Sequence, residues 1–356
     1  MSKDERKTEY AIQSAKPCTR DLLGEDVYKL SSLVQFGRGL SKWPPSHDLS
    51  TGSANIVIST SEMHVLFSNN NNRAVSSDFY RAFQSQSQNN VALTCLGAVG
   101  DNGQPAAVIK KLPKRAAPEK LDFLFVYPGT NNSLVRDDVD LNAVAKVVGK
   151  FLYVEAGKRD KHSLMEIQRT IVHEGVHFFG QNEILGSSPK GGDQGFSSRQ
   201  FLIAKYRENI DFRASVVQEL CVGKELLEAI FIDTKNSREE VKTLLIKMIK
   251  IGNDRRDNST INVKDAEEFW YLVEGIPQYL DHEILIRNGA KGALIDLFRP
   301  YCMKEEYNTS VFYPLLAGAA IAHGLDFVLG SREAWQGYAK FDRMGPSSWM
   351  VFLKYL

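Results

Sequence analysis

The stretch "RTIVHEGVHFFGQ", residues 169–181, decides how the rest of the chain is interpreted. It holds two of the seven histidines of the chain, His173 and His177, and Glu174 directly follows the first of them. Residues four apart in a helix lie on one face, about one turn from each other. If the stretch is helical, both imidazoles can therefore reach one metal ion. Glu174, roughly 100° further round the helix, can reach a water molecule on that ion without being a ligand itself.

The residues on either side predict that this stretch is a helix. Ser163 and Glu166 have the S-x-x-E spacing of a capping box, in which two side chains satisfy backbone N–H groups at a helix start. Apolar residues follow with helical spacing: Leu164, Ile167, Ile171, Val172 and Val176. Gly180 is a typical helix stop. We therefore predict a helix over residues 163–180, with the two histidines in its interior.

The pattern H-E-x-x-H is typical of helices that bind a catalytic zinc ion. Two imidazoles and one further protein ligand leave the fourth position of a tetrahedral zinc ion to water, and the glutamate serves as general base for that water. A lone histidine on an apolar helix face is more often a core residue than a ligand. Here the apolar flanks, "TIV" at 170–172 and "FF" at 178–179, would keep water and competing ligands away. We therefore predict that the chain binds one Zn²⁺ ion.

The segment "TIVHEGVHFF" resembles the active-site helix of the zincin metallopeptidases. Within that superfamily, the third zinc ligand separates the branches. Metzincins have a further histidine shortly after this helix, whereas the next histidine in this chain is His282. The resemblance is therefore to the gluzincin branch, whose third ligand is a glutamate on a later helix. It implies a zincin-like fold, a zinc cofactor and hydrolysis of peptide bonds.

The segment "EEFWYLVEGIPQYLDHE", residues 267–283, is the best candidate for the third ligand. It resembles the Glu-Gly-x-(Ala/Pro)-x-Tyr stretch that carries this ligand in several gluzincin families, and the resemblance implies Glu274. The carboxylate also follows a run of apolar and aromatic residues, and a charge in such surroundings needs a partner. The alternative is a helix-start glutamate that accepts hydrogen bonds from backbone N–H groups near Pro277.

Two other glutamates compete with Glu274 for this role. Glu219 lies in the apolar setting "SVVQELCVG", and Glu208 lies 11 residues before it. The alternative for Glu219 is an ion pair with a helix neighbour such as Lys224 or Arg213. The choice of third ligand therefore stays open between these carboxylates, with Glu274 preferred.

A second electrophile usually meets the oxyanion that forms when a zinc peptidase attacks its substrate. The segment "VFYPLLAGAAIAHGLD" resembles a downstream gluzincin helix in which a tyrosine precedes a glycine and small residues, and this implies Tyr313. His323 and Tyr279 are alternatives, as is a core role for Tyr313 with its hydroxyl on a carbonyl oxygen. Zinc-bound histidines also usually donate their other N–H to a carboxylate. Two candidates for that carboxylate are Asp281 and Asp211.

The order of segments along the chain predicts an α+β fold. Runs with strand character, separated by turn-rich segments, fill the first part: 55–60, 63–68, 90–100, 106–112 and 122–129. Helical periodicity then dominates: 137–150, 163–180, 199–231, 237–251, 264–288, 291–300 and 311–330. The longest loops are predicted at 186–198 and 252–260. We therefore predict a small mixed sheet in the N-terminal half packed on a mainly helical C-terminal half, as a zincin-like fold requires.

Three regions follow from this order. We predict an N-terminal extension over 1–50, a sheet-containing subdomain over 51–185 that ends in the histidine helix, and a helical subdomain over 186–356 with the third ligand. In zincins an edge strand of the sheet binds the substrate in extended form. Either "DFLFVYPG" (122–129) or "KFLYVEAG" (150–157) is expected to be that strand.

Charge and cysteine usage limit the partners and the compartment. Lys plus Arg is 44 and Asp plus Glu is 43, so no basic excess favours nucleic acid or an anionic membrane. The four cysteines are far apart and form no CxxC pair, which favours a reduced compartment but leaves one or two long-range disulfides open. Without an apolar signal segment near the N-terminus, a cytoplasmic location is expected, with specialised export as the alternative. The apolar run at 311–330 is predicted to be a buried helix rather than a membrane span.

The leading hypothesis is a zinc-dependent peptidase that acts on a peptide or protein substrate. His173, His177 and Glu274 would hold the zinc ion, Glu174 would be the general base, and Tyr313 would stabilise the oxyanion. The alternative is a non-catalytic binding protein on a zincin fold, with a structural or vestigial metal site. Glu174 argues against this alternative, because a structural site has no use for a base beside its first ligand.

Overall fold

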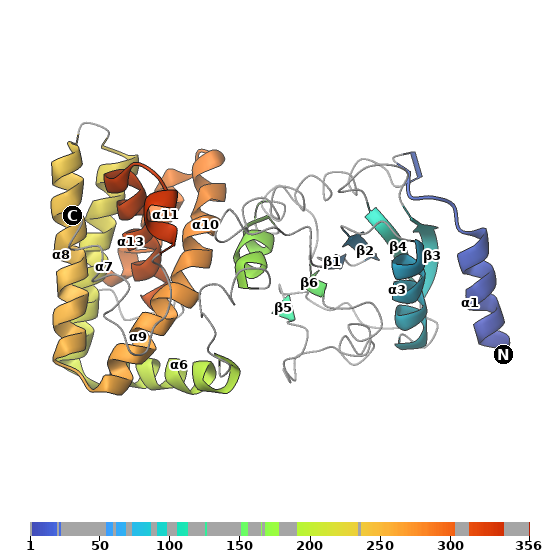
Figure 1. The fold of residues 1–356 in the computed structure, drawn as a ribbon, viewed down its shortest axis with the longest axis horizontal. Coiled ribbons are helices and arrows are strands. Elements are labelled where there is room, and N and C mark those ends of the chain that lie inside the picture. The colour runs from blue at the N-terminus through green and yellow to red at the C-terminus, as the bar shows by residue number, and fades with distance from the viewer. Residues whose placement is uncertain are drawn as a thin grey trace. The chain divides into compact units, whose positions relative to one another are not determined.

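The computed structural model describes residues 2–19, 21–22, 55–59, 62–68, 73–86, 91–97, 105–112, 125–126, 151–155, 165, 168–177, 191–233, 236–302, 313–337 and 356. They belong to two compact units, which are described one at a time. The first unit comprises Met1–Lys42 and Asp48–Phe179, and the second comprises Trp43–His47 and Gly180–Leu356. The first contains a sheet and the second a set of long helices (Figure 1), which confirms the α+β class.

The sheet of the first unit has six strands: β1 (Asn55–Ser59), β2 (Met63–Ser68), β3 (Val91–Leu96), β4 (Pro105–Lys111), β5 (Phe125–Val126) and β6 (Phe151–Glu155). Their order is β3-β4-β2-β1-β6-β5. The sheet is mixed, as predicted, because β1 and β6 run parallel, with Asn55 opposite Phe151, while the other pairs are antiparallel. Of the two segments considered as an edge strand, 122–129 contributes the edge strand β5. The segment 150–157 contributes β6, which pairs on both sides.

Two helices pack beside this sheet, and neither of them was predicted. Helix α3 (Arg73–Gln86) contacts β3 and β4, and α1 (Lys3–Ser14) contacts both α3 and β3 (Figure 1). The two helices and the sheet share one apolar core: Ile12, Val57, Leu66, Phe79, Tyr80, Ala82, Phe83, Val91, Leu96, Ala106, Ala107 and Ile109. Polar tracts at both ends of α3 obscured an amphipathic helix whose aromatic side is buried, with the rings of Phe79 and Phe83 4.6 Å apart.

The described part of the second unit is built from helices: α6 (Gly191–Glu208), α7 (Ile210–Phe231), α8 (Arg238–Asp257), α9 (Ile261–Val273), α10 (Gly275–Arg287), α11 (Lys291–Asp296), α12 (Arg299–Cys302), α13 (Tyr313–Leu329) and α14 (Glu333–Gln336). Helix α13 packs against α7, α8, α9 and α10. A helix that is apolar nearly all round is stable only when neighbours cover every side. The side chains of α13 are buried almost throughout, so the predicted buried helix over 311–330 is confirmed.

Both loops predicted in this unit were partly wrong. Helix α6 begins inside the predicted loop 186–198, and α8 continues to Asp257, inside the predicted loop 252–260. The end of α8 is rich in Asn, Asp and Arg and therefore resembles a solvated loop in the sequence. In the structure three of these polar side chains are buried: Asn253, Arg255 and Arg256.

Two disulfide bonds cross-link the chain. Cys18 pairs with Cys95 in the first unit, and Cys221 pairs with Cys302 in the second. Disulfides persist mainly in oxidising compartments, so the two bonds weigh against the cytoplasmic location expected from the cysteine spacing. Among the residues that the structure describes, none of the helices combines the length and the apolar character needed to cross a membrane.

Candidate metal centre

The two histidines of the motif lie on a helix, as predicted. Residues 168–177 are helical, whereas the predicted caps Ser163, Glu166 and Gly180 lie outside the described residues. The apolar side chains of this helix are fully buried: Ile171, Val172 and Val176. His173 and Glu174, by contrast, are only partly covered. The helix is therefore anchored by its apolar side and leaves the motif side within reach of a ligand.

The imidazoles of the pair are already spaced like zinc ligands. The Nε2 atoms of His173 and His177 lie 3.3 Å apart, and the ring planes are inclined at 66°. Two nitrogens that bind a tetrahedral zinc ion at about 2.0–2.1 Å are about 3.3–3.4 Å from each other. The pair therefore needs no change in nitrogen–nitrogen distance to bind one ion.

Glu274 lies at the break between two helices of the second unit. It follows the last residue of α9 and precedes the first residue of α10, and its side chain makes no capping hydrogen bond. The alternative in which Glu274 caps the helix that contains Pro277 is therefore wrong. The backbone of Glu274 is nevertheless fixed, because its N–H donates to the carbonyl of Trp270 and its carbonyl accepts from the N–H of Gln278, both at 3.0 Å.

A glycine contact sets the path of the chain at this break. A Cβ atom built on Gly275 would lie 2.6 Å from the Cα of Gly318 in α13, and one built on Gly318 would lie 2.2 Å from the carbonyl oxygen of Tyr271. Only glycine permits so close an approach of two backbones. The small residues of α13 therefore pack against the helix junction that carries Glu274.

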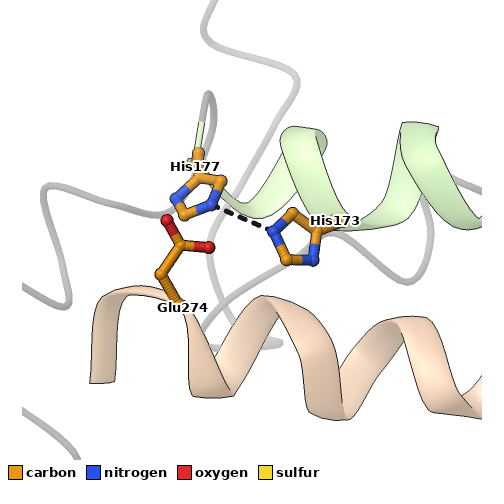
Figure 2. A group of neighbouring side chains, drawn as sticks. All are labelled: His173, His177 and Glu274. Carbon is orange, nitrogen blue, oxygen red and sulfur yellow. Dashed lines mark hydrogen bonds between the residues drawn. The ribbon is translucent and has the colours of Figure 1, made fainter. Parts of the chain in front are cut away.

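Within the described part of the chain, one group of three potential metal ligands is found: His173, His177 and Glu274. One ligand atom from each lies within 4.8 Å of the others, and Figure 2 shows the three side chains as neighbours. A metal ion could in principle bind there. The histidines belong to the first unit and Glu274 to the second, so the complete ligand set is a proposal, made below.

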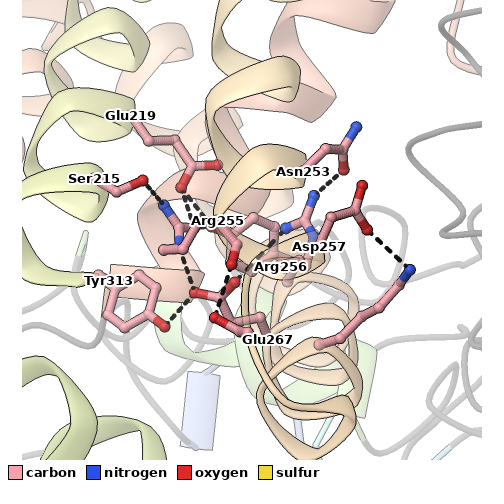
Figure 3. Close-up of polar contacts among 11 residues, drawn as sticks. Ser215, Glu219, Asn253, Arg255, Arg256, Asp257, Glu267 and Tyr313 are labelled. Atoms are coloured by element: carbon pink, nitrogen blue, oxygen red, sulfur yellow. Dashed lines mark hydrogen bonds and ion pairs between the residues drawn. The ribbon is translucent and has the colours of Figure 1, made fainter. Parts of the chain in front are cut away.

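Glu219, the rival candidate for the third ligand, forms an ion pair inside the second unit. Its carboxylate is fully buried and lies 2.6 Å from the Arg255 guanidinium (Figure 3). It also accepts a hydrogen bond from the Tyr271 hydroxyl at 2.7 Å. Its ion-pair partner is therefore neither Lys224 nor Arg213. Lys224 pairs with Glu228 on its own helix, and Arg213 donates to the carbonyl of Arg207. The third candidate, Glu208, is exposed.

Tyr313, the predicted oxyanion stabiliser, is held in the same buried region. Its hydroxyl donates to Oε1 of Glu267 at 2.5 Å (Figure 3). Burial, followed by the nearby Glu267 carboxylate, raises the pKa of Tyr313 well above its usual value, so the hydroxyl keeps its proton. A role in catalysis would require this hydroxyl to leave Glu267, and that role stays a prediction.

Three of the other candidates from the sequence, Tyr279, His323 and Asp281, also have partners within the second unit. Tyr279 donates to Asp326 and accepts from the Nε of Arg332 at 2.9 Å. His323 stacks on His282, with Nε2 of the first 3.2 Å from Nδ1 of the second. As for the two aspartates, Asp281 accepts from the Gln278 amide at 3.2 Å and Asp211 is exposed on α7.

The buried His323 predicts a loss of stability in acid. Burial, and to a lesser extent Arg332, lower the pKa of His323 to about 3. An imidazole in an unfolded chain has a pKa of about 6.5, so the unfolded state takes up the proton first. The contribution of His323 to the free energy of unfolding is thus present above pH 6.5 and is lost as the pH falls toward 3, by up to about 1.4 kcal/mol per pH unit. Urea unfolding at pH 7.5 and pH 5 should show this loss as a lower free energy of unfolding at pH 5. In His323→Gln, the difference in free energy of unfolding between the two pH values should be about 2 kcal/mol smaller. An unchanged difference would contradict the assignment.

Comparison with protein-family models, curated proteins and solved structures gives no match for this chain. The likeness to gluzincins therefore rests on the two motifs. No pattern in the sequence predicted the buried polar group around Arg255, Glu267 and Tyr271. The one available signal was that α8 starts with a capping box, formed by Ser237 and Glu240, which predicts a robust helix but not where it ends.

Proposed function

We propose that this protein is a zinc-dependent peptidase of the gluzincin kind. His173, His177 and Glu274 would hold the zinc ion and leave a fourth position for water. The observation that carries the proposal is the 3.3 Å separation of the two Nε2 atoms on one helix face, with Glu274 as the third member of the group. Three nitrogen and oxygen ligands with an open fourth position are typical of catalytic rather than structural zinc sites.

The chemistry of the site follows from the roles of these residues. When bound, zinc lowers the pKa of its water toward neutrality and polarises the scissile carbonyl. Glu174 would accept a proton from the attacking water and donate it to the leaving amine. Its place directly after His173 puts it roughly 100° away round the helix, so Glu174 would serve as the base and not as a ligand.

Metal analysis combined with a cleavage assay tests the proposal. We expect one zinc ion per purified chain, cleavage of an unfolded protein substrate detected by mass spectrometry, loss of cleavage with a chelator, and recovery when zinc is added back. His173→Ala and Glu274→Ala should each lose both zinc and cleavage, because two ligands rarely retain the ion. Glu225→Ala, an exposed glutamate on α7, is the control that should retain both.

The outcomes separate the two candidate functions. A chain without zinc would overturn the proposal. A chain that binds zinc through these residues but cleaves no peptide would favour the non-catalytic binding protein. Zinc that stays bound in Glu274→Ala would show that a residue other than Glu274 is the third ligand.

A further inference from the structure

A buried polar network lies in the second unit, one helix turn from Glu274 along α9. Its centre is Arg255 near the end of α8 (Figure 3). The Nε of Arg255 donates to Glu267 at 3.0 Å, and one Nη donates to both Glu219 at 2.6 Å and the Tyr271 hydroxyl at 2.9 Å. Tyr271 in turn donates to Glu219 at 2.7 Å. One guanidinium therefore joins α7, α8 and α9.

The network is balanced in charge and closed to solvent. Two carboxylates, Glu219 and Glu267, face two guanidinium groups, Arg255 and Arg256, and all four side chains are at most 2% exposed. Burial lowers the pKa of Arg255, but the two carboxylates outweigh burial and hold it well above its usual value. A buried ion pair is seldom more stabilising than apolar residues of the same volume. Its hydrogen bonds do, however, fix direction and distance, which apolar contacts do not.

The network stabilises the face of α9 that leads to Glu274, the proposed ligand. Glu267, Tyr271 and Glu274 are spaced by four and then three residues, so they follow one face of the helix. The first two are the network members of α9. Tyr313 of α13 also contacts this face, because its hydroxyl donates a hydrogen bond to Glu267. The rotation of α9 about its axis, and its position along that axis, are thus set by four side-chain hydrogen bonds just before Glu274.

We propose that this network positions Glu274 for metal binding. Glu267 and Tyr271 are positioning residues: they touch neither metal nor substrate, and they act by fixing the helix from which the Glu274 carboxylate extends. The inference rests on the proposed zinc site. It assigns a function to a cluster of buried charges that a fold held together by apolar contacts alone would not require. Residues that orient a ligand typically change metal affinity when they are removed, while the ligand itself stays in place.

Tyr271→Phe tests the inference with the smallest change. It removes one hydroxyl and leaves the ion pairs of Arg255 with Glu219 and Glu267 in place, so the chain should still fold. We expect zinc affinity, measured by competition with a chelator, to fall about 10–100-fold. The visible absorption of the cobalt-substituted protein should also change, because that spectrum reports ligand geometry.

Leu245→Ala is the matched control. Leu245 is fully buried on the same helix as Arg255 but lies outside the network, and its truncation costs at least as much stability as the loss of one hydroxyl. Zinc affinity and the cobalt spectrum of this variant should stay at the wild-type values at a temperature where it is folded. Zinc affinity that falls equally in both variants, or in neither, would show that the network serves stability alone. Failure of wild-type protein to bind zinc would instead reject the zinc site itself.

Discussion

Glu174→Gln is expected to lower kcat/KM for peptide cleavage by about 10²–10⁴-fold while one zinc ion stays bound. Glutamine keeps the size of the side chain and can still form hydrogen bonds, but it cannot take a proton from water at neutral pH. Since Glu174 is not proposed as a ligand, the ion should remain on His173, His177 and Glu274. Steady-state cleavage of a fluorogenic peptide, together with metal analysis of the same sample, measures both quantities.

The combination of the two results is what identifies a general base. Loss of zinc in Glu174→Gln would mean that the side chain is a ligand or that it supports one. Unchanged cleavage would mean that another group activates the water, and the mechanism would be wrong. Glu225→Gln, which makes the same chemical change at an exposed position of α7, should leave kcat/KM unaltered.

Gly318→Ala should reduce the free energy of unfolding by about 3 kcal/mol, at the upper end of the usual cost of overpacking. The added methyl group would meet backbone atoms that cannot rotate away: the carbonyl oxygen of Tyr271 at 2.2 Å and the Cα of Gly275 at 2.9 Å. Helix α13 would have to move away from the junction of α9 and α10. Because Glu274 lies in that junction, weaker zinc binding should accompany the loss of stability.

The same substitution elsewhere in the unit provides the comparison. A Cβ atom on Gly292, in α11, would meet nothing within 4 Å. Gly292→Ala should therefore raise the free energy of unfolding by about 0.5–1 kcal/mol, since alanine favours a helix more than glycine does. Urea unfolding of the two variants should give effects of opposite sign. If Gly318→Ala were as stable as wild type, the tight contact between α13 and the α9–α10 junction would be incorrect.

Local patterns predicted much of the fold. The strands over 55–59 and 63–68 are short runs of apolar residues between turn-rich segments of the sequence, and the histidine helix has apolar residues at helical spacing. Both signals depend on residues within one element. Helix α3 was missed because the polar tracts around it, at 69–72 and 84–90, look like loops in the sequence, although its aromatic side is recognisable once the sheet that covers it is known.

The candidate site shows where a single sequence stops being informative. Glu219 and Glu274 both sit among apolar residues, so the sequence ranks them only through a resemblance. The structure separates them, because Glu219 has a partner, Arg255, that is 36 residues away along the chain. That pairing depends on how two helices are placed, and Arg255 was assigned to a loop. Neither its burial nor its partner could be inferred from neighbours in sequence.

Each of the two disulfides closes a loop within one half of the chain, and neither joins the two halves. Cys18–Cys95 lies wholly before the histidine helix, and Cys221–Cys302 lies wholly after it. A protease that cut the chain once between residues 180 and 190 would therefore leave two fragments with no covalent bond between them, even without a reductant. In the proposed zinc site, the ion would then be bound to one fragment through two imidazoles and to the other through a single carboxylate.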